Sequence, residues 1–313
     1  PIIFLFLFRG ARNHMALFNS TSWAKYSVIA ASLAGVMMLG GCAKKEEHTT
    51  TTLNIGYQKY GILPILKARG DLEKALKDQG VQVKWVEFPA GPQLLEGLNV
   101  GSVSLGEAGE APPIFAQAAA KPLTYVAYEV VAPTAQAILV HPNSQINTLQ
   151  DLKGKRIAVQ RGSSAHELLA KTLQKAQLSW QDIEPIWLPP SDARAAFDKK
   201  AVDAWAIWEP YLGTAELQGH TKALIDGRSF PTTYSFYIGN PNFIQKHPQA
   251  VQKVINAIND ADHWIVKHQD QALKIYAGST GLDSQVAQRV LDKRPKPSPV
   301  RPLTTGVTLH QQE

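Results

Sequence analysis

The sequence predicts an α/β fold built on parallel sheets. Segments with the apolar or alternating pattern of strands alternate with amphipathic segments of helical length, and this alternation is typical of parallel sheets covered by helices. Glycine and proline stand at many of the junctions, where they end one element and allow the next to begin. No repeat with a period of about 20 to 50 residues is present, which argues against a solenoid or a propeller.

The first half of the folded body contains five expected strands. Residues 53–58, LNIGYQ, alternate apolar and polar side chains, and residues 61–80 follow with helical spacing. Pro92 is expected to open a helix with a leucine stripe, and PPIFAQAAA a second helix, because proline at a helix start loses no hydrogen bond. The expected strands are 53–58, 81–88, 102–109, 123–131 and 135–142.

The second half continues the alternation. A short helix at 147–154 precedes a strand at 155–160. A helix then begins near Ser164, because Ser164 and Glu167 have the spacing of a capping box, which would leave Ser163 as a spare hydroxyl. The remaining expected elements are strands at 183–190, 202–210 and 233–240, a helix from Ser191 or Asp192, a helical region from 248 with a break near Gln269, and a helix from Thr304 or Thr305.

Composition excludes several classes of protein. The chain has 313 residues and a formal net charge of +6. Arg9, Arg12 and Lys25 are the only charged residues before Cys42, so the body from Cys42 onward carries +3. This mild charge comes without a dense basic patch, which argues against nucleic-acid binding. Cys42 is the only cysteine, so no intramolecular disulfide and no cysteine-based metal site are expected.

The N-terminal segment has the character of a targeting sequence. Met15 is the first methionine, so residues 1–14 are expected to be an upstream artefact. The apolar run that ends at Gly41 has 15 residues, too short for a spanning helix and typical of a signal peptide. Leu39-Gly40-Gly41-Cys42 resembles a bacterial lipobox, with Cys42 as the lipidated residue. The alternatives are a free buried cysteine and a degenerate spanning helix. Residues 42–52 are expected to form a disordered tether.

Six segments together resemble the aliphatic sulfonate-binding proteins. They are GYQK, VEFPAGPQLLEGLNVGS, PPIFAQAA, DLKGKRIAVQRGSSAH, SDARAAF and VDAWAIWEPY. The resemblance implies a two-lobed periplasmic-binding-protein fold of type II with the ligand in the cleft between the lobes. It places the crossing segments near Ala132–Gln136 and Phe230–Tyr234. Lobe I would comprise residues 53–134 and 233–313, and lobe II residues 135–232. Members of the family continue past residue 313, so the chain is expected to be truncated there.

The resemblance also implies a function without chemistry. The chain would be an extracytoplasmic receptor of an ABC importer, in the periplasm or cell envelope, that captures aliphatic sulfonates for sulfur uptake. Its partners would be permease subunits with their cytoplasmic ATPase and a membrane reached through the lipid anchor, with no cofactor, no metal ion and no nucleic acid, and it would be a monomer. The alternatives are the same receptor for taurine, nitrate or another small anion, an enzyme like the thiamine-pyrimidine synthases, and a structural lipoprotein. Neither a G-x-S-x-G nor an H-E-x-x-H motif is present, so no catalytic residue is expected.

Four strand-to-helix junctions are the expected anion site. Ligands of open α/β sheets lie at the carboxyl ends of strands, and each helix start there offers unpaired N–H groups and partial positive charge. A sulfonate can therefore be held by neutral donors. The junctions are 58–61, 109–113, 162–164 and 208–211, and the expected ligand residues are Gln58, Gly109, Glu110, Ala111, Ser163, Ser164, His166, Trp208 and Glu209.

Several of these residues have a plain structural alternative. The serines at 163 and 164 would then only cap a helix, and His166 would be a surface residue. Trp205 and Trp208 are three residues apart and face opposite sides of a strand, so Trp208 is expected in the cleft and Trp205 in the core.

Glu110 is the least expected residue beside an anion. It would either cap a helix and face away, or pair with protonated His166, with Arg161 or with an ammonium group on the ligand. The resembled family usually carries threonine or serine at the position of Ala108, which leaves the ligand open between a sulfonate, a sulfate ester and another small anion.

Overall fold

The structure, a computed structural model, describes residues 51–311. The expected signal peptide and the expected lipidation site Cys42 lie outside the described residues. The expected tether, residues 42–52, is too long by two residues, because Thr51 and Thr52 already pair with Val81 and Gln82 in the first sheet.

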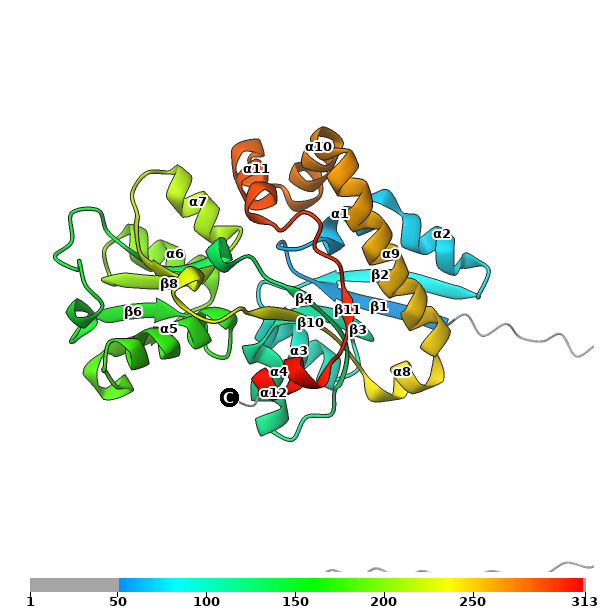
Figure 1. Cartoon of the computed structure of the whole chain (residues 1–313), viewed down its shortest axis with the longest axis horizontal. Helices are drawn as coiled ribbons and strands as arrows, with labels where there is room; N and C mark the ends of the chain where they lie inside the picture. The colour runs from blue at the N-terminus through cyan, green and yellow to red at the C-terminus, as the bar shows by residue number, and fades with distance from the viewer. Residues whose placement is uncertain (1–50, 312–313) are drawn as a thin grey trace, which may run out of the picture. The chain divides into compact units, whose positions relative to one another are not determined.

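The first sheet has six strands in the order β11-β4-β10-β3-β1-β2 (Figure 1). Strand β1 is parallel to β2 and β3, whereas β10 is antiparallel to β3 and β4 and β11 is antiparallel to β4. The strands are β1 (Thr51–Tyr57), β2 (Val81–Glu87), β3 (Leu105–Gly109), β4 (Thr124–Val130), β10 (Tyr234–Gly239) and β11 (Arg301–Pro302).

The second sheet has five strands in the order β7-β6-β8-β5-β9. Strand β6 is parallel to β7 and β8, and β5 is antiparallel to β8 and β9. The strands are β5 (Gln136–Val140), β6 (Arg156–Val159), β7 (Glu184–Trp187), β8 (Ala204–Trp208) and β9 (Lys222–Asp226). Both sheets are therefore mixed, not purely parallel as the sequence pattern predicted, because the chain crosses between the sheets and returns in the opposite direction.

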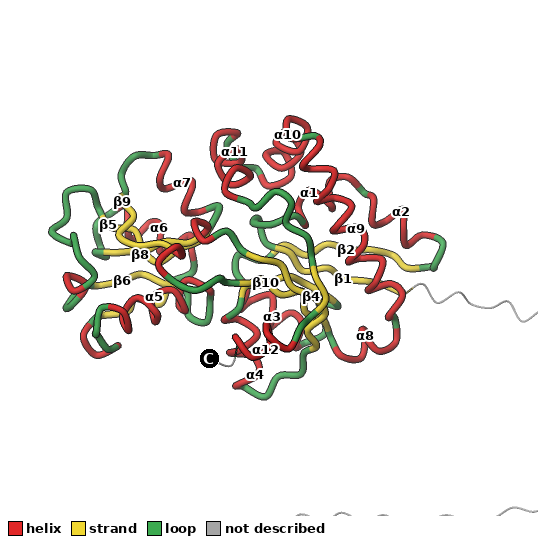
Figure 2. Tube along the Cα trace, viewed as in Figure 1, coloured by secondary structure: helices red, strands yellow, loops and turns green. Residues whose placement is uncertain are grey.

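Helices cover both faces of each sheet (Figure 2). We call the six-stranded sheet with α1–α4 and α8–α12 the first lobe, and the five-stranded sheet with α5–α7 the second lobe. The helices are α1 (Leu63–Arg69), α2 (Asp71–Lys77), α3 (Gly91–Asn99), α4 (Ala111–Ala118), α5 (Ser164–Lys175), α6 (Pro190–Asp198), α7 (Tyr211–Leu217), α8 (Pro241–Lys246), α9 (Pro248–Lys267), α10 (Gln269–Thr280), α11 (Ser284–Lys293) and α12 (Thr305–His310).

Each lobe has apolar cores on both faces of its sheet. In the first lobe, Leu53 and Ile55 pack with residues of α1, α2 and α9–α11 on one face, and Leu94 and Phe236 pack with Val307 of α12 on the other. In the second lobe, one core gathers residues of α5 and the other gathers residues of α6 and α7. Apolar burial of this extent is the main stabilising contribution to both lobes.

Two short connections join the lobes. Residues 131–135 run from β4 to β5, and residues 227–233 run from β9 to β10. The lobe boundaries expected at 134–135 and 232–233 fall inside these connections. Gly227 lies against Pro133 so closely that a side chain at 227 would overlap the Pro133 carbonyl oxygen. The two connections therefore pack directly on one another.

Local expectations differ from the structure at a few elements. The expected helix 147–154 is only a 3-10 turn at Gln150–Leu152. The expected helix 61–80 divides at Gly70, whose φ of 66° ends α1 in the left-handed region, where glycine carries no steric penalty. The short elements β9, β11, α8 and α11 were not anticipated, because short segments and edge strands carry weak periodicity. The break near Gln269 and the helix start near Thr305 agree with α10 and α12.

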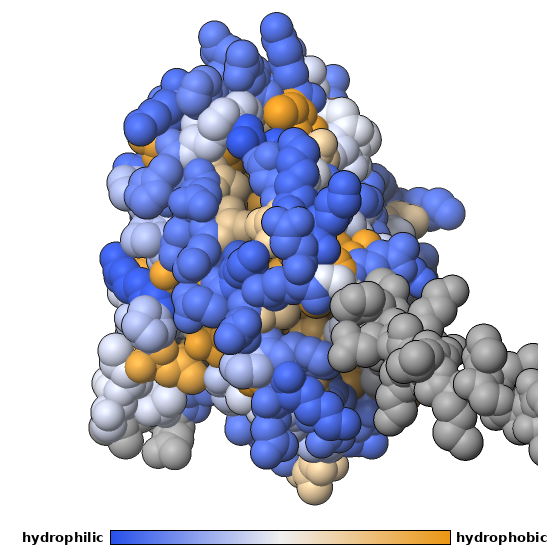
Figure 3. Space-filling view, turned by 90° about the vertical axis from the view of Figure 1, so that its right-hand side faces the viewer, coloured by the Kyte–Doolittle hydropathy of each residue, from blue (hydrophilic) through white to orange (hydrophobic). Residues whose placement is uncertain are grey.

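The exposed face of the first lobe is mostly hydrophilic, with small separate hydrophobic patches (Figure 3). Within residues 51–311, no helix is both long enough and apolar enough to cross a membrane.

Candidate ligand-binding site

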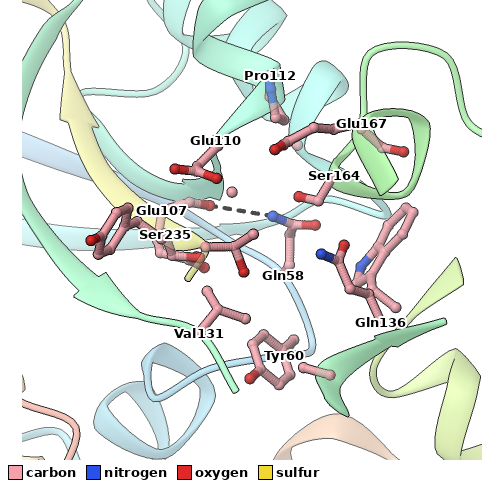
Figure 4. A pocket seen from close by; sticks show the side chains of 17 residues that line it. Gln58, Tyr60, Glu107, Glu110, Pro112, Val131, Gln136, Ser164, Glu167 and Ser235 are labelled. Carbon is pink, nitrogen blue, oxygen red and sulfur yellow. Dashed lines mark hydrogen bonds between the residues drawn. The ribbon is translucent and has the colours of Figure 1, made fainter. Parts of the chain in front are cut away.

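A small cavity lies between the lobes, at the carboxyl ends of β1, β3 and β8 and at the start of α5 (Figure 4). Its volume is about 50 Å³, room for roughly three to five water molecules when each needs about 10–15 Å³. Its lining draws on both lobes and both connections, and comprises Gln58, Tyr60, Gly91, Glu107, Gly109, Glu110, Pro112, Val131, Ala135, Gln136, Ser163, Ser164, Glu167, Trp208, Thr233, Tyr234 and Ser235.

The start of α5 supplies hydrogen-bond donors to this cavity. Ser163 is the N-cap, with extended backbone, and its hydroxyl accepts the N–H of His166 at 3.3 Å and donates to the Gln160 carbonyl at 2.7 Å. The sequence predicted that Ser164 caps the helix and that Ser163 is the spare hydroxyl, and the structure reverses these two roles. Ser164 is already helical, so its spacing to Glu167 does not form a capping box. Ser163 is the cap, and Ser164 is the hydroxyl that faces the other lobe.

Ser164 meets the first lobe at Gly109. A methyl group at position 109 would overlap the Ser164 hydroxyl and lie 3.3 Å from its Cβ, so only glycine allows this approach. Within the described residues, the backbone N–H groups of Ser164 and Ala165 donate no hydrogen bond. These two groups add the partial positive charge of a 12-residue helix start to the cavity wall.

Two amide side chains reach the cavity from opposite lobes. Gln58 follows β1, and its Nε2 donates to the Glu107 carbonyl at 3.3 Å. Gln136 opens β5 and is 7% exposed, and its Oε1 has no hydrogen-bond partner among the described residues. In Figure 4 both amides lie in the middle of the cavity. Each amide carries N–H donors that suit an anionic oxygen.

The start of α4 differs from that of α5. Pro112 and Pro113 occupy its first turn and have no N–H, so the number of donors at this junction is small. Glu110 is the N-cap residue but its side chain makes no capping hydrogen bond. The residue is 4% exposed, and its carboxyl group lies near the side chain of Glu167. Burial, with the charge of Glu167, raises the pKa of Glu110 to about 8, so Glu110 is protonated at neutral pH.

A second protonated carboxyl group lies deeper. Glu107 on β3 is 4% exposed, and burial, with the charge of Glu129, raises its pKa to about 8. The nearby side chain of Ser235 on β10 acts in the opposite direction and lowers this pKa in part. The acidic character of the wall is therefore partly cancelled at neutral pH by protons bound to Glu107 and Glu110.

His166 lies outside the cavity lining. Its Nδ1 accepts the N–H of Gly162 at 3.1 Å, and its ring packs against Phe115, Trp180 and Trp187. Burial and the nearby charge of Arg161 lower its pKa, which favours the neutral ring that this accepted hydrogen bond requires. His166 therefore holds the loop before α5 and does not line the cavity, where it was expected.

Glu209 is likewise not in the lining. It is fully buried, accepts the N–H of Gly213 at 2.9 Å and pairs with Lys293 of the first lobe at 2.5 Å. Its side chain thus caps α7 and joins the lobes. The neighbouring Trp208 lines the cavity, whereas Trp205 is 1% exposed in the core of the second lobe.

Two further expectations concern alanines of the first lobe. Ala111 is 3% exposed at the start of α4 and is not in the lining. Ala108 is fully buried and packs in the core of the first lobe, so it faces away from the cavity.

Most of the missed lining residues carry no local signal. Tyr60, Gln136, Glu167 and Ser235 reach the cavity only because distant segments converge there. Glu107 had a weak signal, since an acidic residue inside an otherwise apolar strand is uncommon. Within the described residues, no group of three or more His, Cys, Asp or Glu side chains is placed to hold a metal ion. The side chains of Gln58, Gln136 and Ser164 supply neutral donors that suit a small polar ligand.

Comparison with known proteins identifies close relatives. The family model described as NMT1/THI5 like matches residues 76–272. A protein of Escherichia coli (strain K12) whose name places it among the aliphatic sulfonates-binding proteins is 43% identical over 288 residues, which are 92% of this chain and 89% of that protein.

Two solved structures are similar over most of the chain. The alkanesulfonate-binding protein from Xanthomonas axonopodis pv. citri, bound to MOPS, is 43% identical with a TM-score of 0.79, covering 84% of this chain and 90% of that one. The periplasmic aliphatic sulphonate-binding protein from Escherichia coli is 44% identical with a TM-score of 0.75, covering 83% of this chain and 84% of that one.

Proposed function

The chain belongs to the family of the aliphatic sulfonate-binding proteins, and from that premise we propose that it is the extracytoplasmic receptor of an ABC importer that captures a sulfonate. Its fold is the periplasmic-binding-protein fold of these relatives. A fold alone does not decide function, so the proposal depends on the cavity and on the identity to binding proteins together.

The observation that carries the proposal is the start of α5. The hydroxyl and the unpaired backbone N–H of Ser164 and two amide side chains belong to residues that line one small cavity between the lobes. A sulfonate spreads one negative charge over three oxygens, and neutral donors at a helix start hold such a group without a buried cation. Binding between two lobes that are joined by two short connections is typical of hinge closure.

The cavity supports binding better than catalysis. Its candidate proton donors, Glu107 and Glu110, lie in an enclosed space that leaves room for only a few waters, and the carboxyl group next to the Ser235 hydroxyl is that of protonated Glu107, which is not a base in that form. We therefore propose that the ligand is released unchanged, to permease subunits that work with a cytoplasmic ATPase.

A thermal-shift and calorimetry screen tests this function. The purified protein should be stabilised by an alkanesulfonate, by about 2.7 kcal/mol at a hundred times the dissociation constant. Sulfate, nitrate and a carboxylate of matched length serve as controls. If no sulfonate stabilises the protein, the proposal is wrong. Release of sulfite or sulfate from the ligand would show that the protein is an enzyme.

We also propose that the protein is attached to the membrane through Cys42 and acts as a monomer. The sequence Leu39-Gly40-Gly41-Cys42 at the end of an apolar run supports this attachment. In a cell that processes lipoproteins, Cys42→Ala should abolish lipid labelling and the associated cleavage. A variant that is still labelled and cleaved like the wild type contradicts the anchor.

A further inference from the structure

Four charged side chains join the lobes on the side of α7 and α11. Both carboxylate oxygens of Glu209 accept a hydrogen bond, one from Lys293 at 2.5 Å and one from the N–H of Gly213 at 2.9 Å. Lys293 also pairs with Glu216 at 3.1 Å, and Glu216 pairs with Arg289 at 2.7 Å. The two glutamates belong to the second lobe, and Lys293 and Arg289 belong to the first. We call Glu209, Glu216, Arg289 and Lys293 the inter-lobe ion cluster.

The cluster lies beside the connection of residues 131–135. The backbone N–H of Glu209 donates to the carbonyl of Ala135 at 2.9 Å, and α11 packs against both α7 and Pro133–Ala135 (Figure 1). The cavity of about 50 Å³ is too small for the alkyl chain of a sulfonate, so ligand entry requires the lobes to move apart. Lobes of this kind rotate about their connections. Atoms next to a connection move least in such a rotation, so the cluster can stay paired while other contacts between the lobes separate.

The cluster also reaches the ligand cavity. Trp208, which lines the cavity, directly precedes Glu209 in the chain. On the other side of the ion pair, Lys293 is followed by Arg294, which is 7% exposed and pairs with the buried Asp262 of the first lobe at 2.6 Å. Lys293 is therefore anchored to the first lobe through its neighbour, and it holds the residue next to Trp208 in the second lobe.

Two other contacts between the lobes are weaker. The hydroxyl of Tyr211 donates to the carbonyl of Pro89 at 3.3 Å in an exposed position. The rings of Phe115 and His166 have centroids 5.3 Å apart, and Phe115 is 46% exposed. Neither contact joins two opposite charges, so both can break at little cost. Separation of the lobes at the cluster would instead remove the cation that balances the fully buried carboxylate of Glu209.

We propose that Lys293 is a positioning residue for ligand binding, and that the inter-lobe ion cluster is the pivot on which the lobes open and close. Through Glu209, Lys293 keeps Trp208 in place at the cavity. The lobes separate at the contacts of Tyr211 and Phe115 while the cluster stays paired. This inference goes beyond the proposed function and depends on it only for the choice of a ligand probe.

Calorimetry with hexane-1-sulfonate tests the positioning role. Lys293→Met and Glu209→Gln each break the buried pair from one side, and each should weaken binding about tenfold to a hundredfold. The double variant has neither charge of the pair, so its loss should be clearly smaller than the product of the two single losses. The control is Arg156→Met, which breaks an ion pair with Asp203 inside the second lobe and should leave the affinity unchanged.

Distances between spin labels test the pivot. Cys42 is the only cysteine, so a Cys42→Ser chain can be labelled at chosen pairs of exposed positions. Labels at Leu217 and Gln285 span the interface of α7 and α11, where both residues line one groove. Labels at Ala118 and Gln181 span the lobes on the side of α4 and α5. On addition of hexane-1-sulfonate, the Ala118–Gln181 distance should shorten and the Leu217–Gln285 distance should stay the same.

The same labels test Lys293 without any ligand. In the ligand-free protein, Lys293→Met should broaden the distribution of Leu217–Gln285 distances, because the two lobes lose their fixed point. Arg156→Met should not change this distribution, since its ion pair lies within one lobe. An unchanged distribution in ligand-free Lys293→Met overturns the pivot, whether or not a sulfonate binds.

The possible results separate the pivot from the proposed function. Three results overturn the pivot while the sulfonate receptor stands: wild-type affinity in both Lys293→Met and Glu209→Gln, an equal loss in the control variant, or a Leu217–Gln285 distance that changes with the ligand as much as the other distance. If neither hexane-1-sulfonate nor any other alkanesulfonate binds, the receptor is wrong, and the distances in the ligand-free protein still decide the pivot.

Discussion

The starts of α4 and α5 face one another across the cavity and have opposite chemistry. At α5, Ser163 caps the helix and leaves the hydroxyl and the unpaired N–H of Ser164 at the cavity. At α4, two prolines remove donors and the N-cap residue Glu110 contributes a buried carboxyl group. The same strand-to-helix geometry thus produces two different sides of the cavity. We call the start of α5 with Ser164 the donor wall, and Glu107 and Glu110 of the first lobe the acid wall.

This difference shows that a helix start is an anion site only when its first turn is free. Helix α7 makes the same point, because the side chain of Glu209 takes the N–H of Gly213 and occupies its first turn. The partial charge of the helix is similar in all three cases. The residues of the first turn decide whether that charge reaches a ligand, and the following predictions test the contrast in order of decreasing effect.

The largest effect is expected from Ser164→Asp, which would place a carboxylate on the donor wall. Two like charges about 4 Å apart cost on the order of 4 kcal/mol at an effective dielectric of 20, which corresponds to a loss of about a thousandfold in sulfonate affinity. The protein should remain folded, because aspartate in the first turn suits the helix dipole. Ser164→Asn, of similar size but neutral, is the control for charge. Wild-type affinity in a stable Ser164→Asp protein, measured by calorimetry, would falsify the donor wall.

The two serines should respond in opposite ways to truncation. Ser164→Ala removes a hydrogen bond to a charged ligand and should cost about 1.5–3 kcal/mol in binding, with little change in stability. Ser163→Ala removes the cap and should cost about 1 kcal/mol in the free energy of unfolding, with little change in affinity. Denaturation curves and calorimetry on both variants test this crossover. Equal losses of affinity would show that the serines act as one unit.

Gly109→Ala should weaken binding by displacing the Ser164 hydroxyl from the first lobe. Overpacking of this kind costs about 2 kcal/mol. Ser164→Gly removes the hydroxyl that the new methyl group meets, so the effect of Gly109→Ala should be much smaller in that background. The double-mutant cycle measures the coupling between the two positions. Additive effects of the two changes would mean that Gly109 and Ser164 do not meet in the bound protein.

The acid wall should make binding of a plain alkanesulfonate dependent on pH. Glu107 and Glu110 each have a pKa of about 8 in the free protein, and a bound anion raises both pKa values further. The bound state therefore holds more protons above pH 8, so affinity is constant below about pH 8 and falls above it, by up to about 1.4 kcal/mol per pH unit for each group.

Glu110→Gln leaves only Glu107 to titrate and should roughly halve the slope of log Kd against pH. Isothermal titrations across the alkaline range measure both slopes. A flat profile in the wild type, or an unchanged slope in Glu110→Gln, would contradict the assignment of the protons to these two carboxyl groups.

Much of the fold was predictable from local pattern. The strands at 53–58 and 81–88 and the helix after Pro92 agree with β1, β2 and α3 to within two residues, because alternation and helical spacing are local properties. The antiparallel strands β5 and β10 were placed along the chain but not oriented. The direction of a strand in its sheet depends on how the chain crosses between the lobes. The hydrophobic periodicity of the sequence carries no information on that direction.

The candidate site was predictable to the level of junctions but not of side chains. Gln58, Gly109 and Trp208 were expected at strand ends and line the cavity. His166 and Glu209 were expected there too, but each is engaged elsewhere, by the Gly162 N–H and by Lys293. Lys293 lies 84 residues away from Glu209, so no local motif reveals that partner.

The sequence by itself determined the alternation of strands and helices, the glycines and prolines that begin and end them, and the positions where helix starts follow strands. Only the tertiary structure decided which helix start remains free, that Ser164 approaches Gly109, and that Glu110 is buried near Glu167. The physical reason is the separation along the sequence of the residues that interact. Periodicity and capping are set by residues within about four positions, whereas burial and the pairing of charges across the cleft arise only when the two lobes pack together.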